Sequence, residues 1–179
     1  VLANKNADIV YKFKQAQVRD ELGYIHKEYQ QYYKDLKVYG ATYAVHIKNE
    51  NVEFINGEFA NLNDFNITPK LQASEVIKIS FSEAMIKYNS ITEKQIEVQN
   101  LVICKDAFST KQNYRLAFET NIKNNNDDIV EIYFIDAESG KILNKEFKIC
   151  HINTTNAIAQ TAYSGTQNYT NGFPISSPN

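Results

Sequence analysis

The sequence predicts an α+β protein made of two small antiparallel sheet units, the second packed on one amphipathic helix, followed by an extended C-terminal tail. Strand-like alternation of polar and apolar residues, interrupted by turn signals, occupies about the first third of the 179-residue chain. An apolar pattern with helical spacing follows, and strand-like alternation then returns. We therefore place the first unit at residues 1–66, the second at residues 67–150 and the tail at residues 151–179.

The first unit contains one stretch, "EYQQYYKDLKVYG" at residues 28–40, whose periodicity fits both a helix and a strand. Its surroundings favour a strand. Residues 38–47 alternate as a strand, residues 48–51 have turn composition, and residues 52–55 alternate again. The Asn56-Gly57 dipeptide that follows is typical of a tight hairpin turn, because both residues tolerate positive φ angles.

One amphipathic helix is predicted between residues 66 and 90. Thr68 can cap its N-terminus, and Pro69 suits the first helical turn, where no backbone N–H is needed. We expect one apolar face, which consists of Leu71, Ala73, Val76, Ile77, Ser80, Phe81, Ala84, Met85 and Tyr88.

At least four strands are predicted after this helix. Their ranges are 97–104, 114–122, 129–136 and 141–149. Turn-rich residues at 123–128 and 137–140 join the last three strands into an antiparallel meander. The tail after Cys150 is small and polar without apolar periodicity, so it cannot build a core of its own. We interpret it as a linker or as the beginning of another domain.

The composition restricts the classes of partner. The chain carries 19 basic and 21 acidic residues and a formal charge of −2, so it lacks the positive field that nucleic-acid binding requires. No apolar run reaches the length of a membrane-spanning helix, and no signal segment opens the chain. Cys104 and Cys150 are the two cysteines, and they could form a disulfide or remain two buried thiols.

Catalytic and metal-binding patterns are missing from the sequence. His26, His46 and His151 are the three histidines, and none has a second histidine one helical turn away to form a zinc peptidase site. Cys150 and His151 are adjacent, and adjacent side chains on an extended chain point to opposite faces. We therefore predict no catalytic residue, no metal ligand and no cofactor in this chain, and a protein as its partner.

Tyrosines offer the best candidates for contact with that partner. Tyrosine is enriched at protein interfaces because it covers a large area with few rotatable bonds. On half-buried strands it serves as a core or interface residue more often than as a stacking platform for sugars or bases. The candidate contact residues are Tyr29, Tyr32, Tyr33 and Tyr43.

Three motifs, in order, are similar to a known family. Residues 20–59, with their Gln-Gln strand and His-containing strand, resemble the fungalysin/thermolysin propeptide (FTP) domain. The predicted helix with "YRLAFETNI" and "VEIYFIDAESGKIL" resembles the PepSY domain. Finally, "TNAIAQTAYSGTQNYTNGF" resembles the beginning of the mature domain of bacterial thermolysin-type zinc metallopeptidases.

The resemblance implies a secreted precursor whose signal peptide has been removed. It implies a strand from Tyr24 to Tyr33, a turn near Lys34-Asp35-Leu36 and a cystatin-like second unit. Such propeptides act in cis as intramolecular chaperones and inhibitors of their own catalytic domain. That domain, which is expected to carry zinc and calcium, would lie outside this chain. A stand-alone inhibitor or protein-binding module that acts in trans is the alternative.

The resemblance also points to one segment for cleavage and for blocking the active-site cleft. Its residues are Cys150, His151, Ile152, Asn153, Thr154, Thr155 and Asn156. A neutral imidazole is a good zinc ligand, so His151 could approach the catalytic zinc, although we favour a surface residue in a linker.

Overall fold

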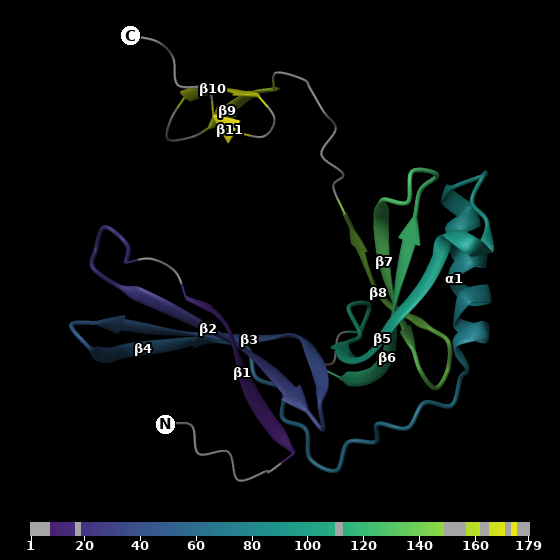
Figure 1. Ribbon diagram of the computed structural model, residues 1–179, viewed down its shortest axis with the longest axis horizontal. Coiled ribbons are helices and arrows are strands. Elements are labelled where there is room, and N and C mark those ends of the chain that lie inside the picture. The colour runs from purple at the N-terminus through teal and green to yellow at the C-terminus, as the bar shows by residue number, and fades with distance from the viewer. Residues whose placement is uncertain are drawn as a thin grey trace.

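The computed structural model describes residues 8–16, 19–109 and 113–148, together with the backbone of three short strands in the tail. In the described residues up to 148 the fold is α+β, as predicted, with one α-helix and one eight-stranded mixed sheet. Figure 1 shows strands β1 to β4 on one side of the molecule, and strands β5 to β8 with the helix α1 on the other. No helix of the described residues is long and apolar enough to cross a membrane.

The first unit consists of four antiparallel strands. They are β1 (Ile9–Ala16), β2 (Ile25–Tyr33), β3 (Leu36–Lys48) and β4 (Asn51–Gly57). The ambiguous stretch at residues 28–40 is therefore strand, turn and strand. The two-residue turn between β2 and β3 is formed by Lys34 (φ 45°) and Asp35 (φ 64°), where the resemblance placed it. Positive φ at both central residues matches the right-handed twist of the flanking strands.

The prediction of a hairpin turn at Asn56-Gly57 is wrong. Both residues lie in β4 and pair with Ala44 and Tyr43 of β3, and the tight turn before them is formed by Asn49 and Glu50. Gly57 is needed for a different reason. Its φ is +140°, and a Cβ atom there would lie 2.3 Å from the backbone oxygen of Thr42.

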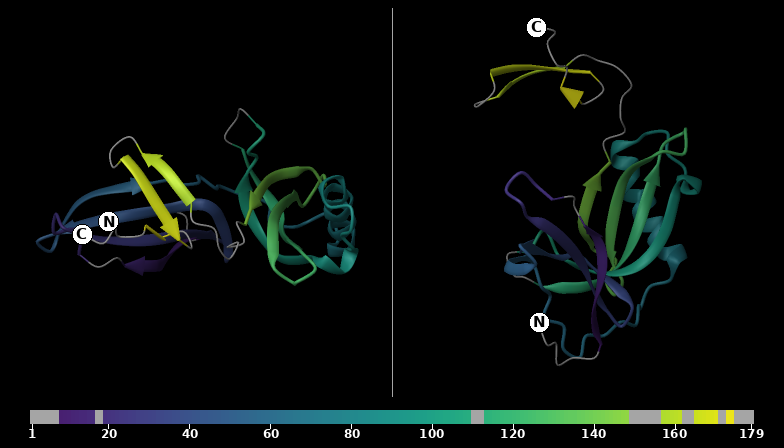
Figure 2. Two further views of the ribbon diagram at one scale, coloured as in Figure 1. Left: turned by 90° about the horizontal axis from the view of Figure 1, so that it is seen from above. Right: turned by 60° about the vertical axis from the view of Figure 1, so that its left-hand side comes forward.

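The helix α1 (Ala73–Lys87) is confirmed, but it begins later than predicted. Its N-cap is Gln72, whose backbone N–H donates to the Glu75 carboxylate at 2.8 Å. Thr68 and Pro69 precede the helix, and the N–H groups of Lys70 and Leu71 donate to the carbonyl oxygen of Ala137. In Figure 2, α1 lies against the sheet of the second unit. The fully buried residues of its inner face are Val76, Ser80 and Ala84.

The second unit contains four antiparallel strands that correspond to the predicted ones. They are β5 (Ile96–Lys105), β6 (Tyr114–Lys123), β7 (Ile129–Asp136) and β8 (Ile142–Phe147), and a 3-10 turn, η1 (Glu93–Gln95), precedes β5.

The prediction of two separate sheet units needs correction, because β3 joins them into one sheet. Val38 pairs in parallel with Ile103 of β5, and residues 43–48 of the same strand pair with β4. The strand bends near Gly40, which has a φ of +78°. Buried Gln30 donates from its side-chain amide to the Val38 and Ala41 carbonyls beside that bend, at 2.7 and 3.0 Å.

A shared hydrophobic core explains why the two units form one sheet. One buried cluster combines residues of the first unit and its exit loop with residues of α1 and of the second sheet. The contributors from the first unit and exit loop are Tyr33, Val38, Ala41, Ala60 and Leu62, and those from the second unit include Val76, Ala84, Ile103, Leu116 and Ile135. On the other face of the second sheet, Tyr39 packs on Phe134 with 4.4 Å between ring centroids and donates to Glu146 at 2.5 Å.

The tail was predicted to be extended without a core. The described parts of its backbone form a separate three-stranded antiparallel sheet of β9 (Ala157–Thr161), β10 (Gly165–Thr170) and β11 (Phe173–Pro174).

Candidate functional site: an exposed aromatic face

Strand register gathers aromatic side chains on one face of the first unit. Phe13 of β1 lies opposite Tyr29 of β2, which lies opposite Tyr43 of β3. The Tyr29 and Tyr43 rings stack with 5.0 Å between centroids and 11° between planes. Aromatic pairs of this kind stabilise a sheet beyond the area that they bury. We call the surface formed by Tyr11, Phe13, Tyr29, Tyr43, Val45, Ile55 and Phe59 the aromatic face.

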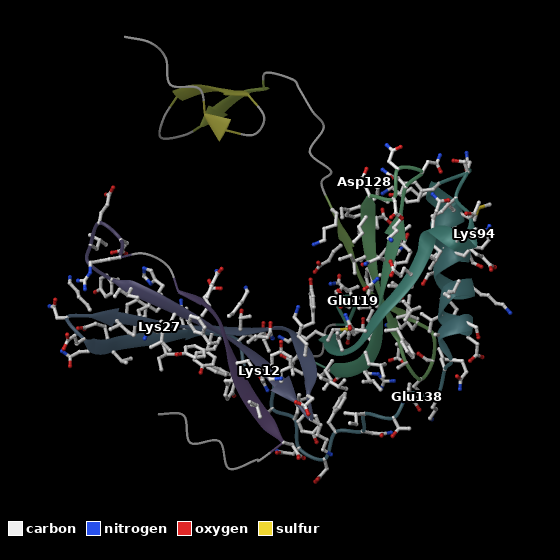
Figure 3. The ribbon with its side chains drawn as sticks, in the orientation of Figure 1. Lys12, Lys27, Lys94, Glu119, Asp128 and Glu138 are labelled. Carbon is white, nitrogen blue, oxygen red and sulfur yellow. The ribbon has the colours of Figure 1, made fainter. Side chains whose placement is uncertain are left out.

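Much of the aromatic face is open to solvent. Phe13 is 58% exposed, and Ile55 and Phe59 are each 42% exposed. The helix α1 lies on the second unit, away from strands β1, β2 and β4 (Figures 1 and 2). Lys27, which lies opposite Val45 and is labelled in Figure 3, places a charge on this otherwise apolar surface. A contiguous apolar patch on a protein surface is typical of an interaction site.

The four candidate tyrosines occupy three different environments. Tyr29 and Tyr43 are half-buried members of the aromatic face. Tyr32 points to the opposite face of the sheet, where the Lys12 ammonium lies 4.3 Å from its ring centroid. Tyr33 is fully buried in the shared core, so its ring has no surface to offer a partner.

Three rings of the aromatic face were not singled out from the sequence. Tyr11 packs edge-on against Tyr43 with centroids 5.1 Å apart, and Phe59 lies 5.3 Å from Tyr43. Phe13 packs against Tyr29 at 5.8 Å. The alternation in "IVYKFKQA" predicts strand β1 and would have placed Tyr11 and Phe13 on one face.

The face opposite the aromatic face holds a pair of histidines. His26 of β2 lies opposite His46 of β3, with 2.6 Å between their Nδ1 atoms. The Nε2 atom of His26 lies 3.1 Å from Asp20 Oδ2, and that of His46 lies 2.8 Å from Asn56 Oδ1. The Phe54 ring stacks on His46 with centroids 4.0 Å apart.

Charged groups buried in the second unit have structural roles. Glu131 accepts hydrogen bonds from Lys87, Tyr88 and Tyr133, and these outweigh the opposing effect of burial, so that the pKa of Glu131 is lowered. Asp136 accepts from Arg115 Nε at 2.7 Å and from the backbone of Ser139 at 2.7 Å. Arg115 and Asp136 also line a cavity of about 140 Å³, where their charges pair with each other.

The described residues contain no group of three or more His, Cys, Asp or Glu side chains arranged to hold a metal ion. Among the described residues Cys104 has no disulfide partner, its side chain is 2% exposed, and burial raises the pKa of its thiol to about 12. Cys150 lies outside the described residues, as does the rest of the candidate cleavage segment from His151 to Asn156, so both the disulfide and the segment stay predictions.

Comparison with known proteins gives two findings. Residues 14–59 match the family model described as the Fungalysin/Thermolysin Propeptide Motif. The chain is 28% identical to bacillolysin of Bacillus amyloliquefaciens over 143 residues, which cover 78% of this chain and 27% of that protein. It is 29% identical to thermolysin of Alicyclobacillus acidocaldarius subsp. acidocaldarius over 133 residues, which cover 70% of this chain and 23% of that protein.

A third relative is the thermostable neutral protease NprT of Geobacillus stearothermophilus, with 27% identity over 135 residues, which cover 70% of this chain and 24% of that protein. The matches thus span about a quarter of the length of these curated relatives. The chain therefore carries a propeptide motif and is distantly homologous to thermolysin-type proteases.

Proposed function

Because residues 14–59 carry a fungalysin/thermolysin propeptide motif, we propose that this chain acts in cis as intramolecular chaperone and inhibitor of a thermolysin-like zinc metalloendopeptidase domain. The precursor is secreted in this proposal, and zinc and calcium belong to the catalytic domain. The second unit corresponds to a PepSY-like domain. The aromatic face is the observation that carries the proposal, because most of it lies inside the matched region and presents apolar area to a partner.

The aromatic face suits a folded protein partner. Burial of apolar surface contributes about 25 cal/mol per Å², and exposed rings such as Phe13 retain area that a partner can cover. Stacking already restricts Tyr29 and Tyr43, so little side-chain entropy is lost when a partner contacts them. The charge of −2 gives the chain little electrostatic attraction, which leaves apolar contact as the main source of affinity.

Covalent connection makes a modest interface sufficient. A short linker holds two domains at an effective concentration in the millimolar range. In the proposal, the segment from Cys150 to Asn156 blocks the cleft, and its cleavage ends the tethering so that the inhibitor dissociates. The same surface stabilises the folding catalytic domain, because a ligand that binds only the native state favours it by mass action.

The test begins with the reading frame that encodes this chain. The proposal requires a His-Glu-x-x-His segment and a later glutamate downstream, and a frame without them overturns it. The encoded peptidase domain is then produced separately, and the 179-residue chain is titrated into it while hydrolysis of a peptide substrate is followed. We expect inhibition that fades as the added chain is cut, and faster recovery of activity when the denatured peptidase refolds with the chain present.

Exposed residues allow a matched comparison of surfaces. Ile55→Ser and Phe13→Ser each remove one side chain from the aromatic face and should weaken inhibition about 5- to 30-fold, the usual range for central interface residues. Ile86→Ser removes a 78% exposed isoleucine from α1 and should leave inhibition unchanged. Equal effects of Ile55→Ser and Ile86→Ser would exclude the aromatic face as the docking surface. Inhibition of unrelated proteases, without any effect on the encoded peptidase, would favour the module that acts in trans.

A further inference from the structure

The His26–His46 pair belongs to a chain of hydrogen bonds that joins four segments. Asp20 lies in the loop before β2, His26 in β2, His46 in β3 and Asn56 in β4. The three contacts are 3.1, 2.6 and 2.8 Å long. All three lie within hydrogen-bonding distance, so the number of protons on the two rings can be counted.

The partners at the two ends of this chain are both oxygen acceptors. The Asp20 carboxylate can only accept, and the Asn56 side chain faces His46 with Oδ1. Each Nε2 atom must therefore donate a proton. Two neutral rings would then face each other with bare Nδ1 lone pairs only 2.6 Å apart, which is repulsive unless a cation lies between them.

We propose that His26 and His46 form a proton-sharing pair that clasps β2, β3 and β4 together. Three protons occupy four ring nitrogens, and the third proton bridges the two Nδ1 atoms. The pair carries one positive charge, and Asp20 supplies the nearest negative charge. Only this protonation state makes all three hydrogen bonds.

The surroundings support a single retained charge. The aromatic rings of Tyr24 and Phe54 stack on His26 and His46, and the His26 side chain is 20% exposed. The nearby charged groups are Arg19, which bonds the Gly23 carbonyl, Glu28, which pairs with Lys14, and Lys48, which lies over the Tyr24 ring. These groups have other partners, so Asp20 remains the one that contacts the pair directly.

The shared-proton arrangement is lost both above and below an optimal pH. Removal of the third proton leaves too few protons for three bonds, so one contact opens. Addition of a fourth proton places two N–H groups and two positive charges face to face at Nδ1.

Unfolding by urea at a series of pH values tests the clasp on the isolated chain. We compare the unfolding free energy of wild type with that of His46→Gln at each pH, because the contribution of the other titrating groups is common to both proteins and drops out of the difference. We expect this difference to pass through a maximum at intermediate pH, where the variant's folding equilibrium constant is about tenfold lower than that of wild type. A difference that instead remains high at alkaline pH would mean a neutral pair with the Asn56 amide reversed, and would overturn the proposal.

Two further measurements do not depend on the folding of that variant. Asn56→Asp keeps an acceptor and adds a negative charge, so the stability maximum should extend to higher pH. Proton NMR of wild type should show one bridging resonance that disappears at both pH extremes. In a separate titration, Zn²⁺ that stabilises wild type but not His46→Gln, with EDTA reversing the effect, would assign the site to a metal ion and overturn the shared proton.

One consequence rests on the proposed function. Because β2, β3 and β4 also carry the aromatic face, inhibition of the peptidase should be strongest at the pH of maximal clasp stability, and His46→Gln should remove that dependence. A stability maximum together with pH-independent inhibition would overturn this coupling and leave the clasp intact. Absence of inhibition at every pH would count against the proposed function alone.

Discussion

Gln31→Ala tests how the first unit is attached to the shared core. Gln31 is fully buried in β2, and its side-chain amide makes two hydrogen bonds with the backbone of Ala60. Nε2 donates to the Ala60 carbonyl at 2.8 Å, and Oε1 accepts from the Ala60 N–H at 2.9 Å. The Gln31 side chain therefore makes the two hydrogen bonds that a neighbouring strand would make with Ala60, and it holds the loop after β4 against β2.

The expected cost follows from the groups left behind. Ala60 is only 3% exposed, so truncation at Gln31 leaves a buried N–H and a buried C=O without partners. Each such group costs about 1–3 kcal/mol, and water that enters the space vacated by the side chain recovers part of this. We expect a loss of about 2–4 kcal/mol in the free energy of unfolding, which corresponds to a decrease in Tm of roughly 5–15 °C.

Urea unfolding followed by circular dichroism measures this loss. Gln99→Ala, at an exposed position of β5, is the matched control and should change stability by less than about 0.5 kcal/mol. A loss below 0.5 kcal/mol for Gln31→Ala would refute the reasoning, because it would mean that the Ala60 backbone finds other partners at no cost.

Three further predictions concern single groups. Wild type should exceed Glu131→Gln in free energy of unfolding by the largest amount above about pH 4.5, the ordinary pKa of a glutamate, and by less as the pH falls below it. The reason is that a carboxyl group whose pKa is lowered in the folded state contributes stability that is lost when the group is protonated. A difference in unfolding free energy that does not depend on pH would contradict this. Gly57→Ala should cost at least about 2 kcal/mol because its Cβ meets the Thr42 backbone, whereas Gly40→Ala, with open space and a φ of +78°, should cost about 1 kcal/mol; equal values would show that the close approach is unimportant. Cys104 in the native chain should react with Ellman's reagent at pH 8 at least about 100-fold more slowly than in urea, and comparable rates would contradict its burial and raised pKa.

Local patterns were enough to identify most elements. The run of β-prone residues in β7 placed its ends at Ile129 and Asp136, as observed, because turn-rich residues lie on both sides of it. The start of α1 was missed because a contact distant in sequence holds the residues before it: the N–H groups of Lys70 and Leu71 donate to the carbonyl of Ala137, and Gln72 is extended. Asn56-Gly57 has the composition of a turn, but the pairing of β4 with β3 uses the glycine for close backbone approach.

The candidate site also combines features that the sequence predicts with features that depend on tertiary contacts. The sequence predicted that tyrosines of the first unit contact a partner, and alternation along a strand places Tyr29 and Tyr33 on one face. It could not separate half-buried Tyr29 from Tyr33, whose burial depends on Ala60, Leu62 and the second unit. Side chains that alternate along one strand differ in exposure only through what packs on them, and that is a long-range property.

The sequence by itself determined most of the secondary-structure elements of residues 25–148 and the class α+β, because these depend on residue type and spacing within short segments. The tertiary structure decided that β3 unites both units in one sheet, that Phe13, Ile55 and Phe59 gather on one face and remain exposed, and that His26 lies opposite His46. Each of these depends on strand register and on contacts between distant segments, which periodicity does not encode.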